Sequence, residues 1–464
     1  MPMELLLIDR DTGRSVLQQS IDERVLSTLP GHYRPARPLP STADADSVWT
    51  VVYEDSERGD RIVEAIEPLI QHRRDDHDVQ VVAIPDVGRD HDLIEDFRRY
   101  ADIDLNTGRP DHVLIVGDLP AISLEVQHEL AEHAYVGRLC FTRDDGRPDL
   151  DGYRSYCDKV ITAETTYQAP RARSMFYCSR GDPVSEQSYG SVVRRSWRTR
   201  EDREFAHRFT NWAKLAAFEE DSEGPAILFS MCHGAYEPEA TRQRARQGGL
   251  VLQEAIGAPY QFLFANQFAD RRFLADGFWF MMTCYSAATP DISVYSSWLE
   301  QLTSVVPQAY IDQARNSLAV ERPFVARLPQ VVLANPEGPL GVLGHADMTW
   351  SMGYNEHRLD RRNGSVETVV GAAYNAYAEV VTRIAEGTAF GVAARGLLEF
   401  LDEDDEPEQA QAASFAEIGQ ADMPPKPEHK RNASIVRALR HMRYLDRRCY
   451  ILLGDPAARL QIAG

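Results

Sequence analysis

Short apolar segments, each about as long as a buried strand, recur along this chain and alternate with longer amphipathic segments. The short segments are almost continuously apolar, which is typical of central strands covered on both faces. The longer segments place apolar residues at three- and four-residue spacing, as helices packed on a sheet do. This alternation predicts an α/β fold, a sheet with helices on both faces. We expect strands at 48–53, 79–84, 112–117, 174–178, 226–231, 278–283, 331–334 and 341–344, and helices at 61–74, 93–101, 152–164, 204–218 and 365–387.

Length and composition narrow the class of protein. The 464 residues are about three times a typical domain of roughly 150, so two or three domains or one large α/β unit would fit. A chain with 43% hydrophobic and 26% charged residues is neither disordered, collagenous nor a membrane protein. The net charge of −21 repels phosphate backbones and anionic lipid surfaces, so neither nucleic acid nor a membrane is an expected partner.

The N-terminal residues and the cysteines indicate the cellular compartment in which the protein works. The apolar run from Leu5 to Ile8 is too short for a signal peptide or a spanning helix, so we expect a cytoplasmic protein. The six cysteines show no CxxC pair and no regular spacing, which argues against a disulfide framework and against a zinc site. We therefore expect free thiols, no metal and no cofactor.

Two breaks in composition mark the organisation of the chain. Residues 1–47 end in the Pro- and Ser-bearing sequence RPARPLPSTADAD and are interpreted as a β-rich extension followed by a linker. Residues 402–432 are acidic and contain Pro, which predicts a mobile surface insertion rather than a binding element.

A histidine directly follows one of the predicted buried strands. The strand at 226–231 runs into Cys232, His233 and Gly234. The carboxyl ends of such strands border the crevice in which open α/β sheets place their ligands, and a glycine allows a substrate to approach the backbone. His233 is therefore a candidate catalytic residue, and a hydrogen-bonded structural histidine is the alternative.

A cysteine follows a second buried strand in the same way. Cys284 ends the strand at 278–283 and lies about 50 residues after His233, the separation that caspases use for their catalytic pair. A thiol with a pKa near 8.5 is mostly protonated at neutral pH, so a nucleophilic cysteine needs a nearby imidazole. The alternatives are that Cys284 is a core residue, or that Cys232 is the nucleophile. Side-chain alternation points Cys232 away from His233 and into the core.

The order of several motifs resembles that of the gingipain-like cysteine peptidases, which are relatives of the caspases, legumain and clostripain. The resemblance spans roughly residues 48–460. It rests on HVLIVGD (112–118), YVGRL (135–139) followed by DGYRSYCDKVITAE (151–164), ILFSMCHG (227–234), FWFMMTCYSAA (278–288), GVLGHADMTWSMGY (341–354) and YILLGDPAARL (450–460). It implies an α/β/α sandwich of two side-by-side caspase-like subdomains, expected at 48–168 and 169–464, with the active site in the second.

The same resemblance implies roles for individual residues. Cys284 would be the nucleophile and His233 the general acid/base, and the backbone N–H groups of Gly234 and Cys284 would form the oxyanion hole. Trp350 would line the S1 pocket, and the remaining substrate-binding candidates beside these motifs are Tyr285, Asp347 and Ser351. The family often has an acidic residue shortly after the strand that corresponds to 174–178, and this residue orients the catalytic histidine. Here Arg180 occupies that position. Asp182, two residues later, is either a substitute or a turn residue.

Two charged groups remain. Arg242, Arg244 and Arg246 in the loop 241–249 could grip an acidic substrate, form a self-cleavage site or simply be solvated. His345 and Asp347 could set the charge of the S1 pocket or belong to an ordinary polar loop.

These observations predict a cysteine endopeptidase that cleaves protein or peptide substrates through a Cys-His dyad and a thioester. We expect Arg or Lys at P1, the residue before the scissile bond, because Asp347 and the charge of −21 favour a basic side chain. An activating partner or self-cleavage is compatible with this expectation. The alternatives are a peptidase that prefers an acidic P1 residue and a catalytically silent caspase-like regulator or scaffold.

Overall fold

The computed structural model describes most of the chain. The described residues are 47–84, 112–166, 169–180, 183–196, 206–221, 224–295, 322–349, 374–399 and 427–463, with short segments at 2–4, 7–9, 18–20, 320, 355–360 and 365–370.

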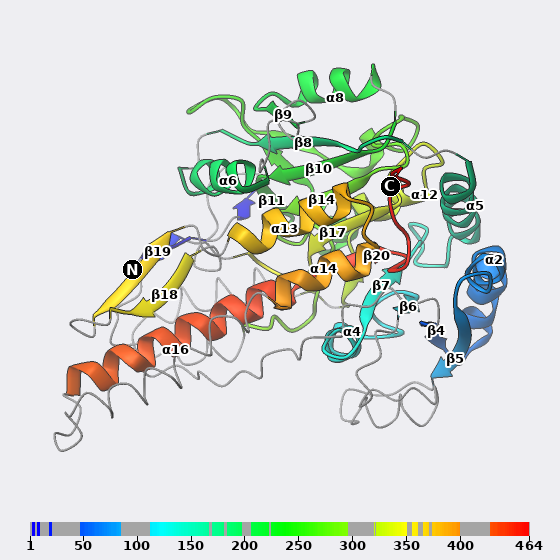
Figure 1. Ribbon diagram of the computed structural model, residues 1–464, viewed down its shortest axis with the longest axis horizontal. Coiled ribbons are helices and arrows are strands. Elements are labelled where there is room, and N and C mark those ends of the chain that lie inside the picture. Colours follow the sequence, from blue (N-terminus) through cyan, green and yellow to red (C-terminus); the bar gives the residue numbers. More distant parts are fainter. Residues whose placement is uncertain are drawn as a thin grey trace.

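A ten-stranded, mostly parallel sheet forms the centre of the molecule (Figure 1). Its spatial order is β5 (Asp78–Ile84), β4 (Val48–Glu54), β6 (His112–Val116), β7 (Tyr135–Leu139), β20 (Tyr450–Gly454), β17 (Gly341–His345), β14 (Phe278–Met282), β10 (Ala226–Met231), β8 (Arg173–Cys178) and β9 (Ala206–Phe209). The junction of β20 with β17 is antiparallel, and every other junction is parallel. The expected α/β/α architecture is confirmed.

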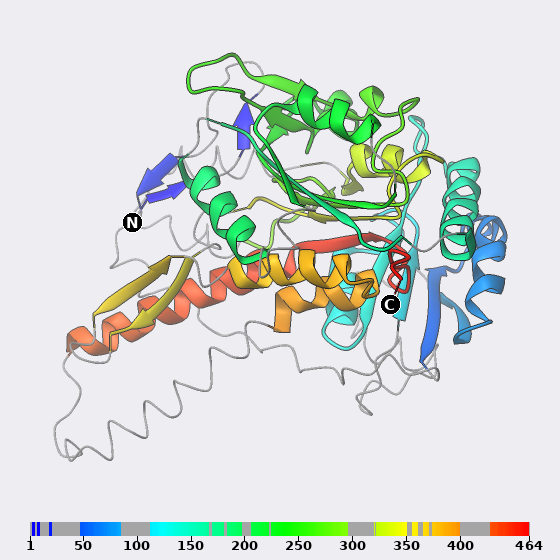
Figure 2. The ribbon, with the colours of Figure 1, turned by 45° about the horizontal axis from the view of Figure 1, so that its top comes forward.

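Helices cover both faces of this sheet. One face carries α4 (Leu124–Ala131), α6 (Pro183–Ser196), α13 (Tyr374–Ala385), α14 (Phe390–Glu399) and α16 (Pro427–Arg448). The other face carries α2 (Glu57–Arg73), α5 (Leu150–Thr166) and α12 (Arg327–Ala334), and α8 (Trp212–Glu220) lies beside β9. Figure 2 shows α13, α14 and α16, coloured gold to orange-red, along a single face. None of the helices in the described part of the chain is both long and apolar enough to cross a bilayer.

The strands bury apolar side chains on both faces, as their composition predicts. In β4, Val51 belongs to the large hydrophobic cluster beneath α2 and α5, whereas its neighbour Val52 belongs to the smaller cluster beneath α4. Successive residues of a strand point to opposite faces, so a strand covered twice must be apolar at nearly every position. Helix α2 illustrates the local signals: the Ser56 hydroxyl caps it by accepting the Gly59 N–H at 3.1 Å.

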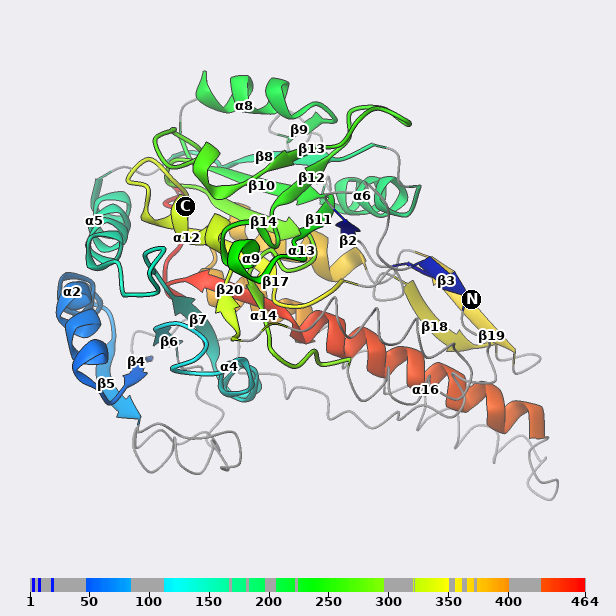
Figure 3. The same ribbon diagram turned by 180° about the vertical axis from the view of Figure 1, so that it is seen from behind.

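Smaller elements complete the fold. A second sheet, in the order β13-β12-β11-β2, consists of β13 (Gln261–Leu263), β12 (Leu250–Leu252), β11 (His233–Tyr236) and β2 (Leu7–Asp9). Beside it lie α9 (Ala240–Arg246) and the 3₁₀ turn η1 (Ala265–Gln267), and Figure 3 shows α9 and α12 in front when the molecule is seen from behind. The remaining pairs are β1 (Pro2–Glu4) with β3 (Gln18–Ser20), β15 (Ala288–Thr289) with β16 (Phe324–Val325), and β18 (Asn355–Leu359) with β19 (Val366–Val370).

Three element predictions are corrected. The apolar run 331–334 is the end of helix α12, because a short apolar run fits a buried helix as well as a strand. The segment 204–218 splits into strand β9 and helix α8. The segment 365–387 begins as β19, whose valines favour a strand, before α13 starts at Tyr374. The other predicted strands are confirmed, as are the helices at 61–74 and 152–164, and 93–101 lies outside the described residues.

The two halves expected at 48–168 and 169–464 share one continuous sheet. Strand β20, from the C-terminal end of the chain, pairs with β7 on one side and with β17 on the other. The extension 1–47 contributes β1, β2 and β3. Of the expected acidic insertion, 402–426 lies outside the described residues, whereas 427–432 is corrected to the start of α16.

Candidate active site

Strands β10 and β14 bring His233 and Cys284 to the same edge of the sheet. The two strands are parallel neighbours, and their last residues, Met231 and Met282, are paired in register. The segments after these residues therefore leave the sheet side by side. Cys284 lies two residues beyond β14, and His233 begins β11 two residues beyond β10.

Gly234 packs directly on the backbone of Cys284. A Cβ atom at position 234 would lie 2.3 Å from the carbonyl oxygen of Cys284 and 3.1 Å from its Cβ. Gly248, at φ +75, makes a similar approach, since a Cβ there would lie 2.0 Å from the carbonyl oxygen of Tyr285. Both glycines allow neighbouring segments to close around the residues that follow β14.

The thiol of Cys284 is fully buried and bonded to the backbone of Thr349. Its Sγ accepts the Thr349 N–H at 3.1 Å and lies 3.7 Å from the Thr349 carbonyl oxygen, to which it donates. Burial raises the pKa of Cys284 well above the usual value, and the charges of Asp446 and Asp347 raise it further, whereas the Thr349 amide lowers it. In this arrangement Cys284 is a protonated thiol shielded from solvent.

Tyr285, the residue after Cys284, has a left-handed backbone conformation with φ 57. Such a conformation costs a non-glycine residue on the order of 1–3 kcal/mol and persists only where the surroundings impose it. The Tyr285 N–H donates to the Asp347 carbonyl at 2.9 Å. The side chain was expected to contact substrate, but in the structure it is fully buried, and its hydroxyl has no hydrogen-bond partner among the described residues.

Hydrogen bonds fasten the loop after β14 to the end of β17. The Ser286 hydroxyl donates to the Thr283 carbonyl at 2.8 Å and accepts the His345 N–H at 2.9 Å. The Ala287 N–H donates to the His345 carbonyl at 3.0 Å. We call residues 283–289 the nucleophile loop, and its shape depends on residues 345–349.

Asp347 lies beside the nucleophile loop, but its carboxylate holds backbone groups. One oxygen accepts the Met348 N–H at 2.7 Å, the other accepts the Val294 N–H at 3.0 Å, and the residue is 1% exposed. Burial raises the pKa of Asp347 to about 6, although these two amides and His345 oppose the shift. The structure thus shows Asp347 inside the loop rather than facing open space, and a counter-charge role in S1 stays a prediction.

His233 and Cys232 differ in their surroundings. His233 is nearly buried, at 7% exposure, and starts the strand that pairs with β12 and β2. Cys232 belongs to the main hydrophobic cluster, with its Sγ 3.4 Å from the hydroxyl oxygen of Thr283. The expectation that Cys232 faces the core is confirmed. Trp350, Ser351 and Asp182 lie outside the described residues.

The arginine segment 241–249 is corrected from a mobile loop to helix α9 and its C-terminal turn. Each of its three arginines has an acidic partner. Arg242 pairs with Glu239 at 3.1 Å, Arg244 with Asp118 at 2.9 Å, and Arg246 with Glu237 at 3.4 Å. These contacts tie α9 to its neighbours, including the end of β6.

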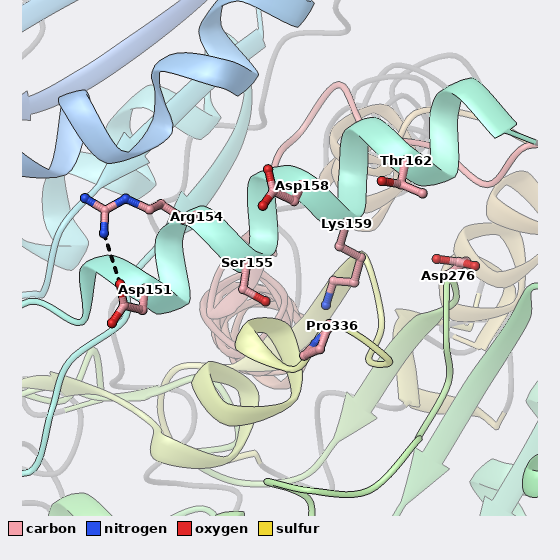
Figure 4. Close-up of a pocket in the computed structure, with 8 residues that line it drawn as sticks. All are labelled: Asp151, Arg154, Ser155, Asp158, Lys159, Thr162, Asp276 and Pro336. Atoms are coloured by element: carbon pink, nitrogen blue, oxygen red, sulfur yellow. Dashed lines mark hydrogen bonds and ion pairs between the residues drawn. The ribbon is translucent and has the colours of Figure 1, made fainter.

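A pocket of about 530 Å³ lies at the other end of the sheet (Figure 4). Lys159 extends from α5 toward Pro336 and donates to the carbonyls of Leu333 and Asn335, both at 2.7 Å. Asp276, which also lines the pocket, precedes β14, whereas Cys284 follows it. The pocket and the candidate dyad are therefore separated by the length of that strand.

Sequence reasoning missed several residues around Cys284. Thr349 acts through backbone groups, which every residue type has, so no side-chain signal marks it. Asp446 reaches the site from helix α16, far away in the sequence. Within the described residues, no group of three or more His, Cys, Asp or Glu side chains could hold a metal ion.

No model of a known protein family matches the chain, and no curated protein matches it. A solved structure described as "Structure of Protease" is similar at a TM-score of 0.49 and 13% identity, over 90% of this chain and 79% of that chain.

Proposed function

We propose that this protein is a cysteine endopeptidase in which Cys284 is the nucleophile and His233 the general acid/base. His233 takes the thiol proton as sulfur attacks the scissile carbonyl, and the protonated imidazole then gives that proton to the departing amine. Water, deprotonated by His233, attacks the thioester and releases the carboxylate and the thiol. The N–H groups of Gly234 and Cys284 are our candidates for stabilising the oxyanion.

The approach of Gly234 to Cys284 is the observation that carries this proposal. It joins the residue after His233 to the backbone of the cysteine, with a separation too small for any side chain at position 234. Two strand ends that independently deliver an imidazole and a thiol thus meet at one place. The left-handed Tyr285 next to the thiol adds a strained turn of the kind that clusters at active sites.

The buried thiol implies that the described arrangement is a closed one. Attack on a peptide requires Cys284 to lose its bonds to Thr349 and to become accessible. We therefore propose that substrate, an activating partner or self-cleavage opens residues 347–349. A cytoplasmic location stays part of the prediction.

Arg or Lys at P1 remains our proposal for specificity. An acidic P1 residue needs an available arginine, and Arg242, Arg244 and Arg246 are each paired with a carboxylate. The overall charge of −21 attracts basic peptides.

The complete burial of Cys284 favours a second candidate function, a catalytically silent module that binds a partner. A peptide with Arg at P1 and a thiol-reactive ketone at its carboxyl end separates the two candidates. We expect it to label Cys284, as located by mass spectrometry, and the matching amide peptide to be cleaved. Absence of both labelling and cleavage would favour the silent module, and labelling of a Cys284→Ala variant at the wild-type level would overturn the assignment of the nucleophile.

A further inference from the structure

His345 lies completely buried behind the nucleophile loop, between acceptors on two elements. Its Nδ1 is 2.7 Å from the carbonyl oxygen of Asp347. Its Nε2 is 3.0 Å from the carbonyl oxygen of Asp446 and 3.5 Å from a carboxylate oxygen of the same residue on α16. The ring also makes an edge contact with Tyr450, with centroids 4.8 Å apart.

These distances suit a ring that carries a proton on each nitrogen. A carbonyl or carboxylate oxygen only accepts hydrogen bonds, so a ring nitrogen at bonding distance from one must carry a proton. Both nitrogens of His345 face such oxygens, so an imidazolium with Asp446 as its counter-charge satisfies every one of these acceptors. A neutral ring protonated at Nε2 would bond Asp446 alone and would accept the Asp347 N–H at Nδ1. Burial alone would lower the pKa of His345, but the hydrogen bond and charge of Asp446, together with the carbonyl and charge of Asp347, outweigh it and raise the pKa.

The Asp347 carbonyl lies between the His345 ring and the backbone next to Cys284. The same oxygen that accepts from Nδ1 also accepts the Tyr285 N–H, and Tyr285 follows Cys284. Two residues beyond Asp347, the N–H of Thr349 donates to the sulfur of Cys284, and the carbonyl of Thr349 accepts from the same thiol. The shape of 345–349 thus determines where Cys284 lies.

Loss of the proton would change the bond that His345 makes. Nδ1 also lies 3.2 Å from the backbone N–H of Asp347, from which a deprotonated nitrogen would accept. In a neutral ring that keeps its proton on Nε2, Nδ1 and the Asp347 carbonyl would be two acceptors 2.7 Å apart, and that carbonyl would have to move.

Other titratable groups surround the ring of His345. They lie on the loop of His345 itself, on α16, between α16 and β20, on β20, on α13, on the nucleophile loop, on the segment before 296 and on α4. They are Asp347, Asp446, Arg447, Arg448, Cys449, Tyr450, Cys284, Tyr285, Tyr295, Tyr377 and His128. Of these, Asp446 is the carboxylate whose side chain reaches the ring of His345.

We propose that His345 is a positioning residue whose proton, held by Asp446, fixes the nucleophile loop in its closed shape. The inference rests on the proposed function only in naming Cys284 as the nucleophile. Deprotonation of His345, or a shift of α16 that removes Asp446, then loosens the loop and exposes the thiol.

The rate at which iodoacetamide alkylates Cys284, followed by mass spectrometry across a pH series, tests this inference. In the wild type we expect a step in the rate as pH rises through the pKa of His345, in addition to the increase due to thiolate formation. His345→Gln should lose the step and react about tenfold faster or more at low pH, because an open state that is a minor one in the wild type becomes populated. Asp446→Asn should also lose it, and the double variant should show less than the product of the two single effects.

One control and one fallback measurement keep the test specific. His72→Gln removes a histidine that bonds Glu164 at 2.7 Å in the other half of the sheet, and it should keep the wild-type profile. Should His345→Gln fail to fold, Asp446→Asn and the NMR titration of His345 in the wild type decide instead. A wild-type profile with no step, or the same step in Asp446→Asn, would overturn the inference. Peptide cleavage is measured separately, so a protein that shows the step but cleaves nothing contradicts the proposed function alone.

Discussion

A methyl group on the α-carbon of Gly234 would lie 2.3 Å from the carbonyl oxygen of Cys284. The obstacle is backbone rather than the end of a flexible side chain, so it cannot move aside at low cost. The strand that begins with His233 and the loop that contains Cys284 therefore keep a fixed separation. This contact links the two parts of the proposed dyad more directly than their separation in the sequence suggests.

Gly234→Ala should disrupt this contact. We expect the free energy of unfolding to fall by about 1–3 kcal/mol, as is usual for overpacking, and peptidase activity to fall because β11 is pushed away from Cys284. Chemical denaturation and a peptide assay measure the two effects. Gly190→Ala is the control, because a Cβ there meets nothing within 4 Å in helix α6, so stability should stay equal or rise slightly.

The proposed chemistry predicts different outcomes for three single variants. Cys284→Ala should abolish peptide cleavage, and His233→Ala should lower it by about 10²–10⁴-fold, the usual contribution of a general acid/base. Cys232→Ala should keep activity, since that side chain lies in the core beside Thr283. Initial rates on one peptide compare all three. A Cys284→Ala protein that still cleaves would end the proposed mechanism.

A buried ion-pair cluster predicts how acid affects stability. Arg73 bonds Glu164 at 2.6 Å and Asp455 at 2.6 Å, so it joins α2, α5 and the segment after β20. Burial opposes ionisation of Glu164, but the charge and hydrogen bonds of Arg73 and His72 outweigh it and lower its pKa to about 2. Because the folded-state pKa lies below the unfolded one, this contribution is present above about pH 4.5 and is lost as pH falls toward 2.

Glu164→Gln should therefore remove about 3 kcal/mol of stability at neutral pH and flatten the decline in stability below pH 4.5. Denaturation measured at several pH values checks both effects. Glu67→Gln is the matched control, because its contact with Arg74 is long, at 3.8 Å, and half-exposed. Equal acid sensitivity of Glu164→Gln and the wild type would contradict the assignment.

The sequence predicted what depends on local patterns and missed what depends on distant partners. The valines and phenylalanines of β4, β6, β10 and β14 identify buried strands, because only strands covered twice need apolar residues throughout. His233 and Cys284 stood out because each follows such a strand. The Asp446 carboxylate lies on an amphipathic helix far along the chain, and no local pattern pairs it with His345. The 331–334 run was misassigned because four residues cannot separate strand from helix.

The start of helix α16 at Pro427 sets how much of the acidic segment 402–432 can be replaced without loss of stability. Residues 402–426 are acidic and poor in apolar side chains, a composition that predicts little gain from burial to offset the entropy of ordering. Replacing 402–426 with a short Gly/Ser linker should leave the melting temperature nearly unchanged. Extending the replacement to 432 should lower it, because Pro427 starts the helix that carries Asp446. A large drop for the shorter replacement would show that 402–426 is packed.

The choice of P1 residue depends on which charge the S1 pocket can neutralise. Burying an acidic or a basic side chain without a counter-charge costs several kcal/mol. Arg244 and Arg246 are engaged with the buried carboxylates of Asp118 and Glu237, whereas the pair of Arg242 with Glu239 is half-exposed and weak. Basic peptides are also attracted by the overall charge of −21.

Peptides that differ only at P1 should thus be cleaved faster after Arg or Lys than after Asp, by at least about tenfold in kcat/KM. Efficient cleavage after Asp and none after Arg would reverse the assignment. Asp347→Asn then locates the counter-charge. If Asp347 supplies it, the carboxylate must leave the Val294 amide when substrate binds, and the variant loses the preference for Arg. If the Asp347→Asn variant keeps its preference for Arg, the counter-charge lies on another residue. The two backbone hydrogen bonds that hold the Asp347 carboxylate favour this second outcome.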